Sequence, residues 1–214
     1  MLLVRHLADL PVGLLATGSV VTIGAYDGVH LGHQQLLGRV IREARRSERP
    51  SVLMSFEPTP KEFFAEVSPP ARLMRFREKF DALAEHGIDI FFCPRFDPAM
   101  RGIRADAFIR QILVHGLNVR HLVVGDDFRF ASRREGTIEH LARASRALQF
   151  GLERVPSVVV DGVRVSSTVI REALADGDMP RASTLLGRPY RMSGKIVKGR
   201  QVGRSLGYAT ANVD

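Results

Sequence analysis

The sequence has no tryptophan, and it has only one cysteine among its 214 residues. A single cysteine excludes an intrachain disulfide and is typical of a protein from a reducing compartment. Cys93 ends a run of apolar residues, which predicts a buried and unreactive thiol. No apolar run is long enough to span a membrane, and the first six residues lack the pattern of a signal peptide. We therefore expect a cytoplasmic protein with no membrane partner.

The sequence also lacks a concentrated basic patch, although its charge is unbalanced. It has 31 Lys and Arg residues against 23 Asp and Glu, a net charge of +8. Such an excess favours an anionic partner, which can be nucleic acid or a phosphate-rich small molecule. The longest basic runs are only two residues long, at Arg45 with Arg46 and at Arg133 with Arg134. We therefore expect small-molecule substrates and no nucleic acid. The oligomeric state is not indicated.

Short apolar runs alternate with amphipathic segments from about residue 20 to residue 160. Expected strands cover residues 20–23, 51–56, 88–93 and 119–124. Expected helices begin near residue 31, where Leu37, Val40, Ile41 and Ala44 have helical spacing, and also cover residues 76–86, 105–115 and 137–148. This alternation predicts an α/β fold, a Rossmann-like parallel sheet with helices on both faces. Such sheets bind ligands at the carboxyl ends of their strands.

The pattern changes after about residue 187. Residues 191–199 alternate like an exposed strand, and glycines without a helical period follow. We predict a main domain over residues 1–187 and an incomplete β segment over residues 188–214. About 25 residues are too few to fold independently without disulfides or a metal. We therefore expect the segment to pack on the main domain, to be disordered or to pair with another chain.

The loop over residues 24–33 carries the strongest chemical signal. Gly24 and Gly28 permit tight turns and a close approach of the backbone to a ligand. A helix that begins near Leu31 would direct its free backbone amides and the positive end of its dipole at that ligand. This combination predicts an anion, such as a phosphate group, at the start of the helix.

Two histidines stand at the start of the same helix. His30 and His33 are separated by three positions, and Gly32 between them has no side chain to cover the site. Imidazoles placed there can donate hydrogen bonds to phosphate oxygens whose charge grows during transfer. Alternatively, the pair caps the helix or lies in the core. A zinc site is less favoured, because no third ligand stands at a suitable spacing.

A second signal lies in residues 165–172. Ser166, Ser167 and Thr168 precede an apolar periodic segment and supply a helix cap. Arg171 follows in the first turns, where the helix dipole disfavours a cation by up to ~1 kcal/mol. A bound triphosphate would reverse that cost, and solvent exposure of Arg171 is the alternative.

Two further loops follow expected strands. In residues 125–130, Asp126 or Asp127 can bind magnesium or a ribose hydroxyl, and Phe128 or Phe130 can stack on a ring. An ordinary surface loop would also tolerate the acidic residues. Residues 56–60 leave a strand through two prolines, which fix a rigid turn, and a purely structural role is the alternative.

Together these segments resemble the bacterial bifunctional riboflavin kinase/FMN adenylyltransferase family, also called FAD synthetase. The family motifs Gly-Asn-Phe-Asp-Gly-Val-His-x-Gly-His, Phe-Glu-Pro-His-Pro, Gly-x-Asp/Asn-Phe-x-Phe-Gly and Ser-Ser-Thr-x-Ile-Arg are similar, in this order, to residues 24–33, 56–60, 125–131 and 166–171. Residues 186–190 resemble the join to the kinase domain, and residues 203–212 resemble its first nucleotide-binding motif.

The resemblance implies the fold of the HxGH nucleotidylyltransferases, followed by an incomplete β-barrel segment. It also implies that FMN attacks the α-phosphorus of ATP, with Mg²⁺, to give FAD and pyrophosphate. The implied catalytic residues are His30, His33, Ser167 and Arg171. The implied ATP-binding residues are Gly24, Tyr26, Asp27, Gly28, Gly32, Arg164, Ser166 and Thr168. The implied FMN-binding residues are Phe56, Pro58, Asp127 and Phe128, and the implied metal ligands of the kinase motif are Thr210 and Asn212.

Three positions in the site loops depart from the family pattern. Ala25 replaces an asparagine, Thr59 a histidine and Ala131 a glycine. These changes leave two alternatives open, a diverged nucleotide- or flavin-binding protein without activity and a nucleotidylyltransferase with another phosphorylated acceptor. Because residues 188–214 match only the beginning of the kinase domain, we expect no riboflavin kinase activity from them.

Overall fold

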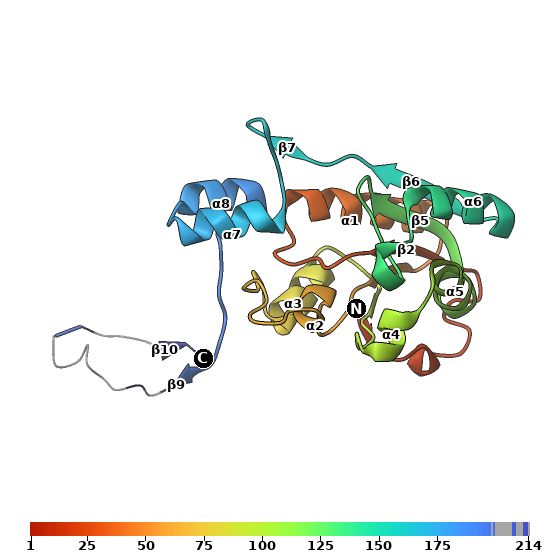
Figure 1. Cartoon of the computed structure of the whole chain (residues 1–214), viewed down its shortest axis with the longest axis horizontal. Coiled ribbons are helices and arrows are strands. Elements are labelled where there is room, and N and C mark those ends of the chain that lie inside the picture. Colours follow the sequence, from red (N-terminus) through yellow and green to blue (C-terminus); the bar gives the residue numbers. More distant parts are fainter. Residues whose placement is uncertain (198, 200–206, 209–211, 214) are drawn as a thin grey trace.

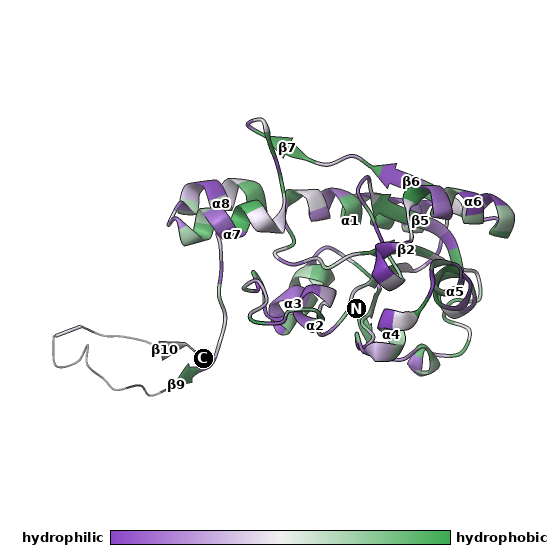
Figure 2. Ribbon diagram, in the orientation of Figure 1, coloured by the Kyte–Doolittle hydropathy of each residue, from purple (hydrophilic) through white to green (hydrophobic). Residues whose placement is uncertain are grey.

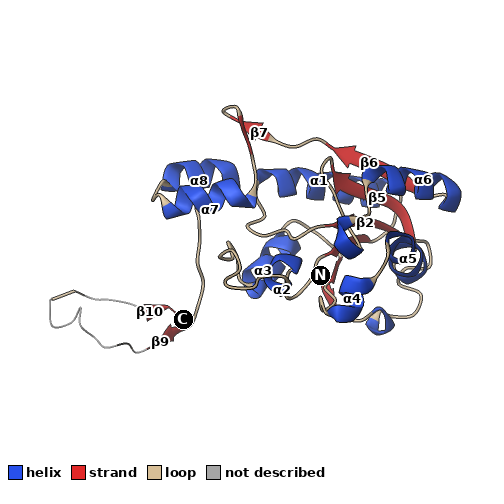
Figure 3. Cartoon of the chain, in the orientation of Figure 1, coloured by secondary structure: helices blue, strands red, loops and turns tan. Residues whose placement is uncertain are grey.

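The centre of the molecule is a parallel β-sheet, drawn as red arrows in Figure 3. The computed structural model describes residues 1–197, 199, 207–208 and 212–213. Within them this sheet has six strands in the order β1-β4-β3-β2-β5-β6, all paired parallel. The predicted parallel sheet is confirmed, and two edge strands join the four that were expected. The strands are β1 Leu2–Val4, β2 Ser19–Ile23, β3 Ser51–Met54, β4 Ile90–Phe92, β5 Val119–Gly125 and β6 Gly151–Val155.

Strand β2 is the point at which the strand order reverses. The chain passes from β2 to β3 and β4 on one side, and β5 later pairs with the other side of β2. All five residues of β2 are buried, as expected for a central strand covered on both faces. In open parallel sheets the ligand site lies beyond the carboxyl ends of the strands at such a reversal. The fold therefore predicts a ligand site at the loop that follows Ile23.

Helices cover both faces of the sheet, as predicted. On one face, α1 (Leu31–Arg46) and α3 (Phe76–Glu85) pack with Val20, Leu53 and Phe91 of the sheet. On the other face, Val21 and Leu122 pack with residues of α6 (Ile138–Leu148) and of a π-helical segment (Phe108–Gly116) that continues α5 (Ala105–Ala107). Val20 and Val21 are consecutive and point to opposite faces, as the period of a strand requires. The expected helix over residues 105–115 thus lies in the expected place, wound more widely than an α-helix.

Two more helices form a unit beside the sheet. α7 (Ser167–Ala175) and α8 (Met179–Leu186) lie side by side in Figure 1, and Figure 2 shows apolar and polar residues alternating along both. Ile170, Leu185 and Leu186 pack with Leu73 and Val165 in a third apolar cluster. The short elements are α2 (Pro60–Phe63), α4 (Pro98–Gly102), two 3₁₀ turns (Leu7–Asp9 and Ser132–Arg134) and the hairpin of β7 (Val159–Val160) and β8 (Val163–Arg164). None of the helices in the described part of the chain is long and apolar enough to cross a membrane.

The chain leaves the main body after α8, as Figure 1 shows at lower left. Gly187 ends α8 in the left-handed region, with φ of 71°. Tyr190 packs against the third apolar cluster, and the backbone N–H and hydroxyl of Ser193 both donate to Glu78. Beyond this contact, β9 (Ile196–Val197) pairs antiparallel with β10 (Asn212–Val213). The expected β character is confirmed for these four residues.

Candidate active site

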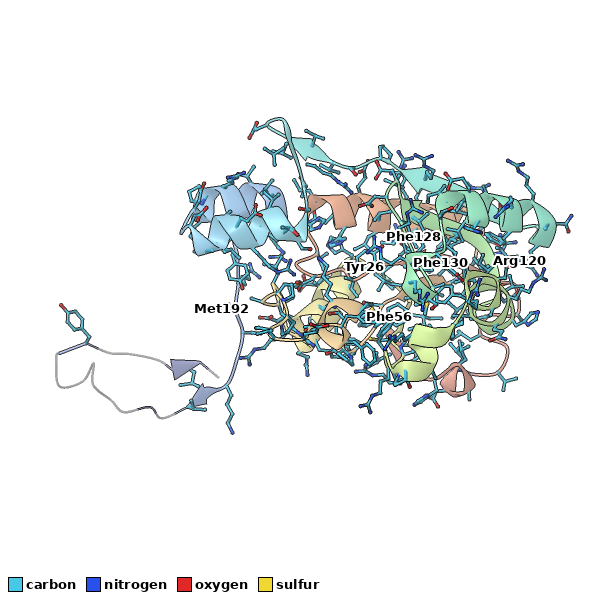
Figure 4. All side chains as sticks on the ribbon, in the orientation of Figure 1. Tyr26, Phe56, Arg120, Phe128, Phe130 and Met192 are labelled. Carbon is cyan, nitrogen blue, oxygen red and sulfur yellow. The ribbon has the colours of Figure 1, made fainter. Side chains whose placement is uncertain are left out.

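A cavity of about 390 Å³ opens at the carboxyl ends of the central strands. Its lining joins two chemically different regions. One region is polar and comes from the loop after β2 and from α7, at Gly24, Ala25, Asp27, Ser167 and Arg171. The other region is aromatic, at Phe56, Phe96, Phe108, Phe128 and Phe130. Figure 4 labels Phe56, Phe128 and Phe130 within the main domain.

Asp27 holds the polar region together. Its carboxylate accepts hydrogen bonds from the backbone N–H of Leu73, at 3.0 Å, and of Met74, at 3.1 Å, and it forms an ion pair with Arg171. The Asp27 carbonyl accepts from the hydroxyl of Ser167 at 2.9 Å. Two sequence motifs about 140 residues apart thus meet at one carboxylate.

The loop after β2 has unusual backbone geometry. Tyr26, Gly28 and Val29 all have positive φ, of 50°, 86° and 40°. A side chain at Gly28 would also meet Leu73, since its Cβ would lie 2.8 Å from Leu73 Cδ1. Positive φ at a β-branched residue such as Val29 is unfavourable, and residues held in this way cluster at functional sites.

Tyr26 contributes packing to the loop and does not offer its side chain to the cavity. The ring is fully buried, and its hydroxyl forms a 2.6 Å hydrogen bond with Thr22. Burial raises the pKa of this phenol. The Tyr26 ring lies under His33, with 4.8 Å between the two ring centroids. The predicted ATP contact of Tyr26 is therefore restricted to its backbone.

His30 and His33 form a stacked pair at the start of α1. Their ring centroids are 3.6 Å apart and their planes differ by 17°. The Nδ1 of His30 accepts from the backbone N–H of His33 at 3.3 Å, so His30 also caps the helix. A side chain at Gly32 would press on His30, since its Cβ would lie 3.2 Å from Cε1 of that ring. Helix capping, the alternative to a phosphate contact, is thus one role of His30.

The hydrogen bonds of His30 and His33 indicate which ring nitrogen carries the proton in each neutral imidazole. Because His30 Nδ1 accepts, the proton of the neutral ring lies on Nε2. His33 is partly exposed, but its Nδ1 is buried without a partner among the described residues. A buried N–H without a partner is costly, which favours the tautomer of His33 with its proton on Nε2 as well. Each ring then has one N–H donor left for a ligand.

Both rings are neutral near pH 7. Burial lowers the pKa of His30 to about 4, although the nearby Asp27 opposes the shift. Burial, His30 and the Lys79 ammonium hold the pKa of His33 well below its usual range. The pair is therefore suited to donate hydrogen bonds and not to act as a cation or a proton donor.

The lowered pKa of His30 predicts a pH-dependent stability. Between pH 6.5 and about pH 4 the unfolded chain binds a proton on His30 that the folded chain excludes, so stability falls as the pH falls. From pH 7 to pH 5 this residue should remove about 2 kcal/mol of the free energy of unfolding. His30→Asn keeps a good helix cap and cannot titrate in this range. Urea unfolding at both pH values should show a smaller loss for this variant, and equal losses would contradict the assigned pKa shift.

The predicted triphosphate residues on α7 and β8 have different surroundings. Ser166 caps α7 by accepting from the backbone N–H of Val169, whereas Thr168 is exposed. Arg171 donates from Nε to the carbonyl of Ala71 at 2.6 Å and from Nη2 to Asp27. These contacts hold the Arg171 side chain in place. The alternative that this side chain extends freely into solvent is therefore wrong. Its Nη1 has no hydrogen-bond partner within the described residues.

Two residues that were predicted to bind different ligands contact each other. Arg164 on β8 donates to the carboxylate of Asp127 at 2.6 Å. The neighbouring Asp126 accepts from the hydroxyl of Ser157 at 2.8 Å, and this bond lowers the pKa of Asp126. Arg164 and Asp127 thus stand together beside the cavity, while Phe128 lines it.

The loop after β3 contributes one predicted residue to the cavity. Phe56 lines it, whereas Pro58 follows a cis peptide bond and is not among the lining residues. Thr59 stands where the family has a histidine, and it caps α2. Its hydroxyl accepts from the N–H of Glu62 at 3.4 Å, and the Glu62 carboxylate accepts from the N–H of Thr59 at 2.7 Å. The substitution thus has a local structural role.

Ala131 stands where the family has a glycine, in backbone geometry that suits glycine. Its φ of 65° and ψ of −173° lie in a region almost restricted to glycine, with a cost of about 1–3 kcal/mol for other residues. Ala131→Gly should therefore stabilise the fold by about 1 kcal/mol, after the entropy cost of glycine in the unfolded chain. Urea unfolding measures the change. Ala16→Gly, in an exposed turn without positive φ, is the matched control and should lose stability.

Several residues at the site were not identified from the sequence, and three of them stand out. Phe96 and Phe108 line the cavity, and Phe96 meets Phe56 edge to face at 5.4 Å. Lys79 also lines the cavity and is buried. A signal for Lys79 was present, because it falls on the apolar stripe of α3 with Leu83, where a lysine is out of place.

The predicted metal ligands of the kinase motif stay untested. Thr210 lies outside the described residues. The backbone of Asn212 belongs to β10, but its side chain also lies outside the description.

Comparison with known proteins agrees with the motifs. Residues 15–169 match the family model described as FAD synthetase, and residues 186–214 match the model described as riboflavin kinase. The chain is 45% identical to a bifunctional riboflavin kinase/FMN adenylyltransferase of Escherichia coli K12, over 92% of this chain and 63% of that protein. It is 42% identical to the protein of the same name from Haemophilus influenzae, over 92% of this chain and 64% of that protein. The chain thus spans less than two thirds of these curated relatives.

A solved structure shares the fold. It is the crystal structure of a protein described as a macrolide-efflux protein from Streptococcus pneumoniae, with a TM-score of 0.84 and 29% sequence identity. The similarity covers all of this chain and 68% of that one. Since the first family model covers most of the chain and the predicted sheet and motifs are present, the chain belongs to the FAD synthetase family.

Proposed function

We propose that the protein transfers the AMP part of ATP to FMN, which gives FAD and pyrophosphate. The observation that carries this proposal is the cavity itself, which joins a phosphate-type loop at one end to an aromatic region at the other. Both relatives named above are described as FMN adenylyltransferases, which supports the same reaction.

The polar end of the cavity has the groups that a triphosphate requires. Gly24, Ala25 and Asp27 line it, and they belong to the loop that leads into α1, where helix amides and the helix dipole favour an anion. Arg171 lines this end with a positive charge, and its Nη1 has no partner among the described residues. His30 and His33 are not lining residues, but they stand where this loop enters α1, and each has an Nε2–H to donate. Ser167 lines the same end. This set supports binding of ATP phosphates there.

The aromatic end supports a flat acceptor that carries a phosphate. Phe128 and Phe130 stack with 5.6 Å between centroids, and Phe56 and Phe96 form a second aromatic pair. Aromatic walls of this kind suit the ring system of a flavin. The cavity lining also contains arginines without an ion-pair partner in the described part of the chain, namely Arg129, Arg133 and Arg134. Unpaired guanidinium groups favour a phosphorylated acceptor, FMN, over riboflavin.

The reaction requires positioning and charge stabilisation more than covalent participation of the protein. A phosphate oxygen of FMN attacks the α-phosphorus of ATP, and the bond from that phosphorus to the bridging oxygen of the β-phosphate breaks. Pyrophosphate leaves with the bonding electron pair. Negative charge on the transferring group is met by the Nε2–H donors of His30 and His33 and by Arg171. These groups are held in place before the substrate arrives, which is the condition for electrostatic catalysis.

Magnesium is proposed to arrive with ATP. The described residues contain no group of three or more His, Cys, Asp or Glu side chains that could hold a metal. Magnesium on a nucleotide takes most of its ligands from phosphates and water, with one or two protein carboxylates, so no such group is required. Asp27 lines the cavity and is the carboxylate nearest to the polar end, next to Arg171. Bound there, the ion would neutralise part of the triphosphate charge.

The test is to incubate the protein with ATP, magnesium chloride and FMN and to follow FAD and pyrophosphate by chromatography. We expect both products in equal amounts, and we expect no dinucleotide when riboflavin replaces FMN. Binding of ATP and FMN without FAD formation would favour a binding protein without activity. Pyrophosphate release only with a different phosphorylated acceptor would favour a nucleotidylyltransferase that does not use FMN.

A further inference from the structure

The carbonyl groups of the loop after β2 are held by side chains from outside the loop. Four of its carbonyl oxygens accept such hydrogen bonds, each at 2.8–2.9 Å. The four donors come from different elements: α3, α7, α1 and the segment after α8. The pairs are Lys79 to Ala25, Ser167 to Asp27, Arg188 to Gly28 and Gln34 to Val29.

This arrangement determines where the backbone amides of the loop point. In a trans peptide the C=O and the following N–H point in opposite directions. When a side chain holds one of these carbonyls, the N–H of the next residue must therefore point away from that side chain. The amides fixed in this way are those of Tyr26, Gly28, Val29 and His30. No described residue accepts a hydrogen bond from these four amides. Successive free amides in a loop with left-handed residues form a concave site for anions.

Lys79 is the unusual member of the four donors. Its side chain lies on the apolar stripe of α3, and the residue is only 4% exposed. Burial lowers the pKa of its ammonium, and the nearby Asp27 and Glu57 oppose that shift. Neither carboxylate, nor any other in the described chain, forms an ion pair with Lys79. Among the described residues, the side chain of Lys79 makes one hydrogen bond, from its Nζ to the carbonyl of Ala25 at 2.9 Å.

A buried ammonium group without an ion pair destabilises the folded state. Desolvation of the charge is costly, and an apolar side chain of similar length would avoid that cost. The hydroxyl of Ser55 also reaches the Ala25 carbonyl, at 3.3 Å, so a neutral donor is already present. The charge of Lys79 therefore calls for a role other than packing.

We propose that Lys79 is a positioning residue for phosphate transfer, which holds the Ala25 carbonyl at the edge of the cavity and so fixes the orientation of the loop amides toward the phosphates of ATP. The proposal rests on the proposed function for the identity of the ligand. Lys79 acts through the peptide between Ala25 and Tyr26 and does not itself need to touch the substrate. Its positive charge, close to Asp27, also makes the loop more attractive to an anion.

The test compares Lys79→Met with the wild-type chain. We expect the variant to keep or raise the thermal midpoint, because methionine fits an apolar stripe. We expect the Kd for ATP with magnesium, measured by calorimetry, to rise at least tenfold. We also expect kcat/KM for ATP to fall at least tenfold, while the KM for FMN changes less than twofold. A structural role would not separate the two substrates in this way.

Two further variants refine the comparison. Lys79→Arg keeps a cationic donor and should recover part of the ATP affinity. Arg77→Met removes one cation from an exposed position of the same helix and should leave both substrates unaffected. Unchanged ATP affinity in Lys79→Met would overturn the proposal, and so would a large fall of its thermal midpoint, because Lys79 would then be structural.

The outcomes separate this proposal from the proposed function. If the wild-type chain binds ATP but makes no FAD, the function fails while the affinity comparison still decides the role of Lys79. If the wild-type chain binds no ATP at all, the loop is not a phosphate site and the proposal for Lys79 is wrong.

Discussion

Replacing His33 with alanine should lower kcat for FAD formation by about 100-fold or more, with a smaller change in the KM for ATP. The ring is neutral and has one free N–H, and loss of one preorganised donor to a developing charge costs on the order of 100- to 1000-fold in rate. Steady-state assays at saturating ATP and FMN measure the effect. His115→Ala removes an exposed histidine and is the matched control.

The role of His33 as a neutral donor has two more consequences. His33→Gln should keep more activity than the alanine variant, because an amide can also donate. The wild-type kcat/KM, which reports ionisations of the free enzyme, should show no ionisation of His30 or His33 between about pH 7 and pH 8, since burial lowers both pKa values. A raised KM with an unchanged kcat would mean that His33 only binds the ground state, and would contradict this assignment.

The central part of the fold could be predicted from the sequence because its elements have clear periods. Strands β2 and β3 are buried along their whole length, β5 is buried at its apolar residues Leu122, Val123 and Val124, and α1 has a regular apolar stripe. The edge strands were not predicted. β1 has only three residues, and β6 carries Glu153 and Arg154 within its five. Both are defined by long-range pairing with β4 and β5, which no local pattern encodes.

The candidate site was predicted at the level of motifs but not at the level of contacts. The strand β8 before residues 166–171 belongs to a separate hairpin and not to the parallel sheet, so the prediction that these residues meet residues 24–33 depended on the family resemblance. The resemblance was not enough to predict which charges pair, because Arg171 reaches Asp27 and Arg164 reaches Asp127 only once α7 and β8 are in place. The role of Thr59 as a helix cap also depends on where α2 begins.

The ion pair of Asp27 and Arg171 should be the most sensitive point of the site. Arg171→Met leaves the carboxylate of Asp27 buried with only backbone partners, which should cost about 3 kcal/mol of the free energy of unfolding. We also expect kcat/KM for ATP to fall at least 100-fold, because the cation that meets the transferring phosphate is gone. Urea unfolding and steady-state assays measure the two effects separately.

A double-mutant cycle separates the structural role of this pair from its catalytic role. Asp27→Asn removes the charge that Arg171→Met leaves unpaired, so the double variant should be less destabilised than the sum of the single variants, by about 1–2 kcal/mol. The exposed pair of Arg77 and Asp81 is the matched control, and its coupling should stay below about 0.5 kcal/mol. Activity should not recover in the double variant, because no neutral pair replaces the positive charge at the phosphates. If activity recovered together with stability, Arg171 would serve only the fold, and the triphosphate would have to be held by the histidines and the loop amides alone.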